Sequence, residues 1–356
     1  MTKNHIRKFI HIDMDSFFVS VELLSSPNLM GLPVAVGGTA AERGVISTAN
    51  YIARKFGVKS GMATATAHRL CPKLVLLPAR FEVYERISQQ MGEIFKRYTD
   101  KIEFISLDEA SLEVTDQSHC NGSATYMAEE IRQTIEQELY LTASAGVAPL
   151  RYLAKIASEI NKPNGIFVIT PAQTQNFIQN LNIRKIPGVG PKTYSILENL
   201  GCRHCRDLTE EKIPALIQYL GVHGFYVWER CQGIEQSDET PNDIRSIGVE
   251  KTLPSDCFDL SQCHDELLRL AVILRQRITE ASEEFLIIRN NVKLKFSDFS
   301  VSTTEACAHS LNEETFKTLF QKLWDTKRGG RAVRLIGLSV KVKKRIQDTP
   351  QLELPW

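Results

Sequence analysis

The chain has 356 residues, of which 43% are hydrophobic and 24% charged, and its formal net charge is +1. This length and composition predict a globular protein of two to four compact units and exclude a collagen-like or low-complexity chain. No apolar run approaches the length of a membrane span, and the small net charge means that any nucleic-acid binding must depend on local basic patches.

The amino-terminal residues and the cysteines bear on where the protein works. Met1 to Lys8 is polar and basic and does not resemble an export signal. We therefore expect a cytoplasmic protein without membrane attachment, whose eight cysteines are reduced thiols. Cys202 and Cys205 form an isolated C-x-x-C with no second pair at a zinc-like spacing, which favours thiols without a metal.

The first part of the chain predicts a buried strand, a helix and a small subdomain. The apolar run Phe9–Ile12 predicts a strand that stops at Asp13, and a helix is expected from about Ser16. The apolar face of that helix is expected to carry Phe17, Val21 and Leu24. The stretch up to about residue 79, with a strand at 33–37, is rich in small and turn-forming residues and predicts a small subdomain.

Helices and strands interleave between residues 82 and 169, which predicts an α+β domain with a mainly antiparallel sheet. The segment 103–114 predicts a hairpin with Asp108 and Glu109 at its bend. The other elements expected from hydrophobic periodicity are helices at 82–98, 126–139 and 150–160 and strands at 143–147 and 167–169.

The rest of the chain predicts a helical segment at 171–240, a polar linker from 240, and a second unit. That unit reads as strand, helix, strand, strand, helix, strand. Its second helix has Asn312 as the N-cap residue. The buried stripe of this helix is expected to be Phe316, Leu319, Phe320 and Leu323. The alternating apolar residues of the last strand are Ile336, Leu338, Val340 and Val342.

Three acidic residues at strand ends are the candidates for catalysis and for a metal site. Asp13 ends an apolar strand, and Asp108 and Glu109 form the bend of a hairpin. Carboxylates in such places are costly to bury unless a cation lies beside them. Mg²⁺ prefers carboxylate oxygens, and two such ions can activate an attacking hydroxyl and stabilise a leaving pyrophosphate. Taken alone, however, D-x-D and D-E pairs are more often turn acids in solvent.

The sequence around these acids carries more information than the acids alone. Six segments occur in a fixed order: H-I-D-M-D-S-F-F at 11–18, R-G-V-I-S-T-A-N-Y-I-A-R-K-F-G-V at 43–58, S-L-D-E-A at 106–110, S-A-G-V-A at 144–148, L-A-K-I-A-S at 153–158 and N-K-P-N-G at 161–165. In this order they are similar to the segments of the Y family of DNA polymerases, and the resemblance covers essentially the whole chain.

The resemblance implies a multidomain α+β fold in the form of a right hand. An antiparallel-sheet palm, small fingers, a helical thumb with a helix-hairpin-helix motif and an α/β little finger are expected. The implied boundaries are palm 1–20 and 80–170, fingers 21–79, thumb 171–240, linker 241–249, little finger 250–345 and a clamp-binding tail 346–356.

The resemblance also implies a catalytic centre. Asp13, Asp108 and Glu109 would hold two Mg²⁺ ions, which Mn²⁺ is expected to replace, and the Met14 backbone carbonyl would complete one coordination sphere. Asp15 is either a further ligand or a helix N-cap beside the site. Glu109 could also accept the proton of the primer 3′-hydroxyl, although metal coordination alone can acidify that hydroxyl.

Several further positions match the nucleotide site of the family. Phe18 matches the aromatic steric gate that excludes a ribose hydroxyl, with a core aromatic as the alternative, and Phe17 is expected in the core. Tyr84 is expected near the nascent pair, and the small residues at 60–66 would leave an open site that tolerates a damaged template base. The positions that match triphosphate-binding residues are Tyr51, Arg54 and Lys162.

Two segments are candidates for gripping DNA without reading its sequence. I-P-G-V-G-P-K at 186–192 is similar to a helix-hairpin-helix turn, whose exposed N–H groups can meet a phosphate, and a weaker copy lies at 220–224. Residues 251–345 carry 17 Lys and Arg against 12 Asp and Glu, so the net charge of this segment is about +5. The candidate DNA-binding residues are Gly188, Gly190, Lys192, Lys293, Lys295, Lys341 and Lys343.

The last residues resemble a peptide that binds a sliding clamp. Spaced apolar side chains there would fill a groove of the partner once the tail orders on binding. The expected contact residues are Gln351, Leu352, Leu354 and Trp356. The family pattern more often ends in Leu or Phe, so Pro355–Trp356 departs from it.

These observations favour a monomeric, template-directed DNA polymerase of low fidelity that adds deoxynucleotides to a primer and copies past damaged bases. Its expected partners are primer-template DNA, deoxynucleoside triphosphates and the replicative sliding clamp. An alternative is a catalytically inactive scaffold that binds DNA and the clamp, and the presence of all three acids argues against it. A nucleotide cyclase is disfavoured because the thumb turn and the tail have no role there.

Overall fold

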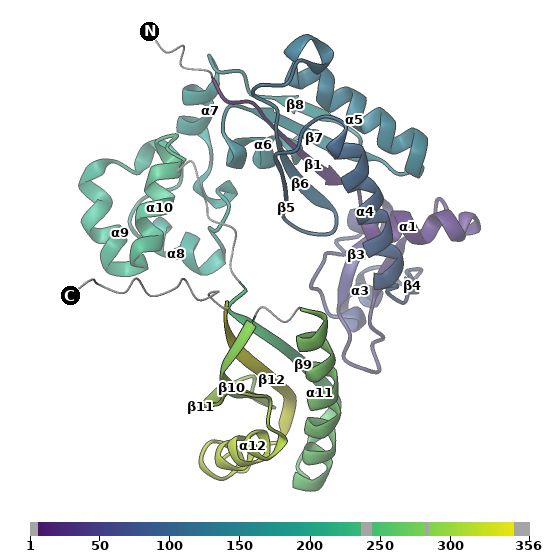
Figure 1. The fold of residues 1–356 in the computed structure, drawn as a ribbon, viewed down its shortest axis with the longest axis vertical. Coiled ribbons are helices and arrows are strands. Elements are labelled where there is room, and N and C mark those ends of the chain that lie inside the picture. Colours follow the sequence, from purple (N-terminus) through teal and green to yellow (C-terminus); the bar gives the residue numbers. More distant parts are fainter. Residues whose placement is uncertain (1–5, 236–243, 282–284, 345–356) are drawn as a thin grey trace, which may run out of the picture. The chain divides into compact units, whose positions relative to one another are not determined.

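The computed structural model describes residues 6–235, 244–281 and 285–344, which belong to two compact units (Figure 1). The amino-terminal unit consists of Met1–Gly37, Ile46–Met62 and Thr66–Ser237, and the carboxyl-terminal unit of Gly38–Val45, Ala63–Ala65 and Asp238–Trp356. Among the described residues, no helix is long and apolar enough to cross a membrane.

The amino-terminal unit is built around a five-stranded sheet with the order β5-β6-β1-β7-β8. The pair β7–β8 is parallel and the other pairs are antiparallel, which confirms the expected mainly antiparallel sheet. β5 and β6 form the expected hairpin. The strands are β1 (Phe9–Met14), β5 (Ile102–Phe104), β6 (Glu109–Glu113), β7 (Ala143–Ala148) and β8 (Ile166–Val168).

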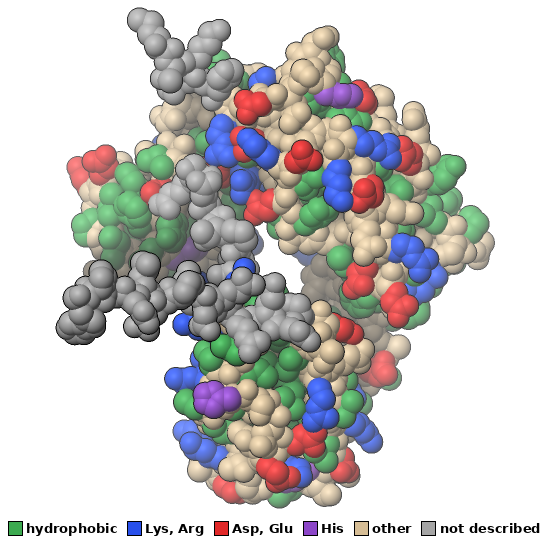
Figure 2. Space-filling model, in the orientation of Figure 1, with side chains coloured by type: hydrophobic (Ala, Val, Ile, Leu, Met, Phe, Trp, Pro, Cys, Tyr) green, Lys and Arg blue, Asp and Glu red, His purple; other side chains and the backbone are tan. Residues whose placement is uncertain are grey.

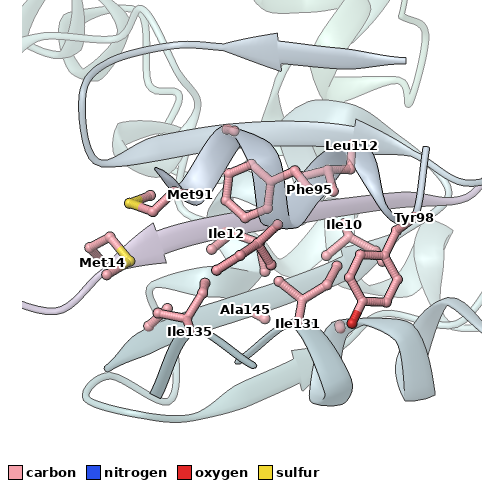
Figure 3. Close-up of a cluster of buried hydrophobic side chains, with 14 of the residues drawn as sticks. Ile10, Ile12, Met14, Met91, Phe95, Tyr98, Leu112, Ile131, Ile135 and Ala145 are labelled. Carbon is pink, nitrogen blue, oxygen red and sulfur yellow. The ribbon is translucent and has the colours of Figure 1, made fainter. Parts of the chain in front are cut away.

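One face of this sheet is covered by two helices, α4 (Phe81–Lys96) and α5 (Ala124–Leu139). Because side chains alternate along a strand, Ile10, Ile12 and Met14 of β1 all point into that core, where each is at most 2% exposed (Figure 3). Full burial of such a side chain contributes about 1.5–3 kcal/mol. The core therefore fixes which way β1 faces, and with it the side on which Asp13 lies.

The opposite face receives α6 (Arg151–Ser158), which packs against β1 and β7. Gly146 of β7 allows this contact. A Cβ atom at Gly146 would lie 1.9 Å from the carbonyl oxygen of Ala154 and 2.4 Å from the amide nitrogen of Ser158. The glycine in S-A-G-V-A is therefore needed for the close approach that brings α6, with its Lys155, beside the strand that carries Asp13.

The first helix, α1 (Phe17–Ser25), differs from the sequence expectation at one position. Phe17 and Val21 are buried as expected, whereas Leu24 is 41% exposed, so its placement on the apolar face was wrong. The reason is that α1 packs on two sides. Val19 contacts the small sheet of the next segment while Phe17 and Val21 join the main core, and Leu24 lies on neither side.

The turn-rich segment that follows forms a three-stranded sheet with the order β3-β2-β4. β2 pairs antiparallel with β3 and parallel with β4, and its valines pack against α1. The elements of this segment are η1 (Pro27–Leu29), β2 (Val34–Gly37), β3 (Ile46–Ala49), α2 (Tyr51–Lys55), α3 (Thr64–Leu70) and β4 (Val75–Leu77).

The expected helical segment shares a core with α6 and with Phe9 of β1. Leu153 of α6 belongs to the same buried cluster as Ile178, Leu216 and Val227. The short turn η2 (His119–Gly122) lies earlier in the chain, between β6 and α5. The helical elements are α7 (Thr174–Asn180), η3 (Ile183–Lys185), α8 (Pro191–Asn199), η4 (Cys205–Asp207), η5 (Glu210–Lys212), α9 (Ile213–Leu220) and α10 (Val222–Cys231).

The carboxyl-terminal unit has the expected element order and a four-stranded antiparallel sheet, β11-β10-β12-β9, with two helices on one face. Asn312 caps its second helix by accepting a hydrogen bond from the Thr315 amide, as predicted, and the expected apolar stripe is buried. The elements are β9 (Ser246–Cys257), α11 (Leu260–Glu280), β10 (Phe285–Phe296), β11 (Val301–Cys307), α12 (Glu313–Lys327) and β12 (Val333–Lys344).

Candidate active site

Two of the three predicted acids meet at one end of the central strands. Asp13 of β1 lies directly opposite Glu109 of β6 in the antiparallel register. His11, two residues earlier on β1, lies on the same face as Asp13 because side chains alternate. One ligand atom each of His11, Asp13 and Glu109 lies within 4.8 Å of the others. The fold thus converts a sequence separation of almost a hundred residues into one polar cluster.

Two lysines provide the positive charge of this cluster. Lys162 Nζ lies 2.6 Å from Asp13 Oδ1 and 2.6 Å from Glu159 Oε1, while Lys155 of α6 pairs with Glu109. The sequence reasoning identified Lys162 but missed Lys155 and His11. The period of two along β1 could have shown that His11 shares a face with Asp13. Nothing local could have shown Lys155, since its place depends on how α6 packs on the sheet.

The two acids have different electrostatic environments. Burial raises the pKa of Asp13, and Lys162 only partly opposes that effect. The hydrogen bond from His11 and the ion pair with Lys155 lower the pKa of Glu109 to about 2, against the effect of burial. Burial lowers the pKa of His11, so its imidazole is neutral at pH 7 and donates its Nε2 hydrogen to Glu109 at 3.2 Å.

Asp108 and Met14 lie next to this cluster and are joined through their backbones. The Met14 amide donates a 3.0 Å hydrogen bond to the Asp108 carbonyl oxygen. The Asp108 carboxylate accepts a 2.6 Å hydrogen bond from the Ser106 hydroxyl and lies outside the cluster of His11, Asp13 and Glu109. The structure therefore places Asp108 at the same strand end, with its carboxylate held by its own loop.

Asp15 is fixed by three donors from three separate elements. Tyr51 of α2 and Ser144 of β7 donate to Oδ1 at 3.2 and 2.8 Å, and the Asn164 amide donates to Oδ2 at 2.7 Å. The N-cap of α1 is Ser16, so the interpretation of Asp15 as a helix cap was wrong. Three donors satisfy the carboxylate, and Asp15 joins α2 and the 161–165 loop to the end of the strand that carries Asp13.

The aromatic residues of α1 divide as their helical phase predicts. Phe17 is 1% exposed, and the half-buried Phe18 stacks on Tyr84 with ring centroids 4.2 Å apart and an interplanar angle of 11°. Tyr84 itself is fully buried and donates a 2.7 Å hydrogen bond to Glu22. The Tyr84 ring therefore supports the Phe18 ring, and the expectation that Tyr84 lies near the nascent pair stays a prediction.

Tyr51 and Arg54 share one turn of α2, which Asn50 caps by accepting a hydrogen bond from the Ala53 amide. The Arg54 guanidinium lies 4.8 Å from the centre of the Tyr51 ring, and its Nε donates to the Ala49 carbonyl. Because Tyr51 also reaches Asp15, this turn is tied to the acidic strand end. Asp15 therefore links the Tyr51 turn to the loop residue Asn164, two positions after Lys162.

The donor set of the strand end fits a hard divalent cation. Its acids offer only carboxylate oxygens, which Mg²⁺ prefers, and the backbone around Met14 and Asp108 adds carbonyl oxygens nearby. The ammonium groups of Lys162 and Lys155 pair with Asp13 and Glu109, so positive charge already lies beside both partly buried carboxylates.

The predicted thumb turn links a single 3₁₀ turn, η3, to helix α8. Gly188 has φ +91°, and a Cβ atom there would lie 3.2 Å from the His223 ring. Gly190 is the N-cap residue of α8, and Lys192 is exposed in its first turn. The weaker copy is a tight turn at Gly221 between α9 and α10. His223 accompanies the first turn, with its Nε2 3.2 Å from the Gly188 carbonyl oxygen.

The predicted lysines of the carboxyl-terminal unit lie on the sheet face opposite its helices. Their neighbours along β10 and β12 are buried against α11 and α12, so alternation places the lysines on the other face. Lys293 pairs with Glu250 at 2.7 Å, Lys341 pairs with Glu305 at 2.8 Å, and Lys295 lies over the Phe299 ring. On the face of this unit that Figure 2 shows, basic and acidic side chains are intermixed.

The proposed clamp-binding residues Gln351, Leu352, Leu354 and Trp356 lie outside the described residues, as does the linker at 240–243.

Two family models match the chain. The impB/mucB/samB family matches residues 12–159, and the C-terminal domain of the same family matches residues 244–354. Among curated proteins, a DNA polymerase IV of Citrobacter koseri is 49% identical over 98% of this chain and 98% of its own length. A DNA polymerase IV of Escherichia coli is 51% identical over 94% of this chain and 96% of its own length.

Solved structures give the same result for the fold. The Y-family DNA polymerase chimera Dbh-Dpo4(243-245)-Dbh superposes with a TM-score of 0.84 at 29% identity, covering 96% of this chain and all of the chimera. An insertion ternary complex of Dbh DNA polymerase superposes with a TM-score of 0.64 at 28% identity, over the same shares of the two chains.

Proposed function

This chain belongs to the Y family of DNA polymerases and is a DNA-directed DNA polymerase of the translesion class, and from that premise we propose how its residues carry out the reaction. The primer 3′-hydroxyl attacks the innermost phosphorus of a deoxynucleoside triphosphate, a new phosphodiester bond forms and pyrophosphate leaves. The observation that carries the proposal is the meeting of Asp13 with Glu109 at the strand end, beside Asp108.

Asp13, Asp108 and Glu109 would hold two Mg²⁺ ions there, with the Met14 carbonyl as a further ligand, and Mn²⁺ could replace Mg²⁺. When bound, these ions would make the primer hydroxyl more acidic and would neutralise negative charge on the phosphates. His11 orients Glu109 through its Nε2 hydrogen. Lys155 and Lys162 place positive charge beside Glu109 and Asp13 before substrate arrives.

Lys162, Arg54 and Tyr51 would bind the incoming triphosphate. Arg54 can present its remaining guanidinium hydrogens to phosphate oxygens while its Nε stays bonded to Ala49. Lys162 can exchange its contact with Asp13 for a phosphate when the site fills. Phe18, held flat by Tyr84, would then meet the sugar. Base pairing with the template selects the nucleotide, and the protein positions its phosphates.

Replacing Lys162 by alanine is expected to lower kcat/KM for single-nucleotide incorporation by roughly 10- to 100-fold, since hydrogen bonds to charged groups contribute about 1.5–3 kcal/mol. Most of this loss should come from an increase in KM for the deoxynucleotide, with a smaller change in kcat. Lys96→Ala, which removes an exposed lysine paired with Glu93 on α4, should leave both constants unchanged. If KM stays constant and only the Mg²⁺ dependence changes, Lys162 serves Asp13 alone and the triphosphate role is rejected.

We further propose the domain boundaries palm 1–20 and 80–170, fingers 21–79, thumb 171–240 and little finger 250–345. The thumb turn with Gly188, Gly190 and Lys192 and the little-finger lysines would contact DNA phosphates without reading sequence. The protein is proposed to work as a monomer in the cytoplasm. Support for these statements comes from the sequence, the exposed Lys192 beside the start of α8, and the lysine-bearing sheet face.

The tail is proposed to bind the replicative sliding clamp. Removing residues 351–356 is expected to shorten the products of clamp-dependent synthesis several-fold, while distributive synthesis without the clamp stays unchanged. Primer extension on a long template, with and without a loaded clamp, measures both. Equal product lengths for the full and shortened chains in the presence of the clamp would reject this role. A chain with Leu352 and Leu354 both replaced by alanine keeps the tail length and should behave like the deletion.

A further inference from the structure

The amino-terminal unit carries a second group of metal-ligating side chains, which the polymerase reaction does not use. His119 and Cys120 lie in η2, and Glu130 lies in α5. One ligand atom of each, a ring nitrogen, a thiol sulfur and a carboxylate oxygen, lies within 4.8 Å of the other two. This group shares no residue with the cluster at Asp13. Glu109 is the first residue of β6, whereas η2 follows the last residue of that strand.

The three side chains already converge on one carboxylate. Glu130 Oε1 lies 2.9 Å from His119 Nε2, and Glu130 Oε2 accepts a 3.1 Å hydrogen bond from Cys120 Sγ. The Tyr98 hydroxyl also donates to Oε1, at 3.1 Å, and its ring contacts the His119 ring edge-on with centroids 5.0 Å apart. The donor atoms are thus assembled by hydrogen bonds that a metal ion could replace.

The backbone of η2 directs adjacent side chains toward the same partner. Cys120 and Asn121 both have positive φ, 49° and 55°, a conformation that side chains other than glycine rarely adopt twice in succession. The turn is held on one side by Lys8, whose Nζ donates to the Gly122 carbonyl at 2.8 Å, and on the other by Ser123, the N-cap residue of α5. The ligands therefore lie on an anchored turn and a long helix.

We propose that His119, Cys120 and Glu130 form a site for a divalent transition-metal ion, with Zn²⁺ as the preferred ion and water as the fourth ligand. A thiolate and an imidazole select borderline-soft ions over Mg²⁺, whereas the acids at Asp13 offer oxygen alone. Two negative ligands neutralise the charge of the ion. The side chains of His119 and Glu130 are 45% and 47% exposed, so an ion can enter from solvent.

Binding has a defined proton balance. The Cys120 sulfur gives up its hydrogen to solvent and bonds to the ion, while the imidazole proton moves to Nδ1 and Nε2 becomes a ligand. Glu130 loses the hydrogen bonds from His119 and Cys120 and gains the metal, while Tyr98 stays bonded to it as an outer partner. The metal would tie η2 to α5 without touching the polymerase centre.

Cobalt(II) provides the test, because a Co²⁺–thiolate bond absorbs by charge transfer and an oxygen-only site does not. The full chain is titrated with Co²⁺ in excess Mg²⁺, which occupies the acids at Asp13. We expect the absorption to grow to one equivalent in the unaltered protein and to be lost in Cys120→Ser. Cys307→Ser, which alters an exposed cysteine on β11, is the matched control and should keep the absorption.

A second measurement keeps the proposal falsifiable if Cys120→Ser folds poorly. In competition with a chromophoric chelator, His119→Ala and Glu130→Gln should each weaken Zn²⁺ binding at least roughly tenfold. Mg²⁺-dependent primer extension by these variants should match the unaltered chain and show that they are folded. Absence of a charge-transfer band in the unaltered protein, a band that survives in Cys120→Ser, or Zn²⁺ affinity unchanged in both exposed-ligand variants would overturn the site.

Discussion

Replacing Asp13 by asparagine is expected to lower kcat/KM for nucleotide incorporation at least about a thousandfold, or about 4 kcal/mol of transition-state stabilisation. Asparagine fills the same space but removes one negative charge from the strand end where Asp13 faces Glu109. The affinity for primer-template DNA, measured by fluorescence anisotropy, should change less than about threefold because the proposed DNA contacts lie on other elements.

A control separates the metal role of Asp13 from its ion pair with Lys162. Glu159→Gln removes the other carboxylate that pairs with Lys162 and leaves Asp13 in place. This variant should retain incorporation within a few-fold. Equal losses in Asp13→Asn and Glu159→Gln would mean that the placement of Lys162, and not a metal ion on Asp13, limits the rate. Retained incorporation in Asp13→Asn would remove this residue from the metal site.

The second large effect is expected on the selection between deoxyribose and ribose in the incoming nucleotide. Phe18→Ala should raise incorporation of a ribonucleotide relative to the matching deoxynucleotide by roughly a hundredfold or more, because the ring that fills the space of a 2′-hydroxyl is gone. The stack with Tyr84 holds the Phe18 ring in one orientation, so the excluded volume is well defined. Single-nucleotide kinetics with the two triphosphates opposite one template base measure the ratio.

Phe81→Ala provides the comparison for this experiment. Phe81 is 53% exposed and meets the Phe18 ring edge-on at 5.8 Å, so its loss removes an aromatic neighbour and leaves the proposed gate intact. Sugar selection should remain near that of the unaltered chain. A ratio that is constant in Phe18→Ala, or that shifts equally in Phe81→Ala, would assign the exclusion of ribonucleotides to another part of the site.

Local patterns in the sequence predicted those features that depend on neighbours along the chain. The buried strand that carries Asp13, the hairpin that carries Asp108 and Glu109, and the burial of Phe17 all follow from periods of 2.0 and 3.6 residues, although β1 continues to Met14. The four residues that the alternation in β12 placed in the core, Ile336, Leu338, Val340 and Val342, are likewise buried.

Features that depend on packing between distant elements were wrong or missed. The three donors that hold Asp15 lie 36, 129 and 149 residues away in the chain. No local pattern could predict these contacts, and the helix-cap interpretation was therefore wrong. Lys155 reaches Glu109 only because Gly146 allows α6 to approach the sheet. Tyr84 of α4 is buried against Phe17 and Phe18 of α1, a contact between two elements that hydrophobic periodicity does not specify.

The most direct test of the account is primer extension on an undamaged template with Mg²⁺ and all four deoxynucleotides, comparing the unaltered chain with Asp108→Ala. Extension by the unaltered chain and none by Asp108→Ala, with DNA binding equal in the two, is the result expected for a polymerase whose strand-end acids hold the metal. Equal extension by both chains would contradict the assignment of the site, and no extension by either, with DNA bound, would contradict the catalytic account itself.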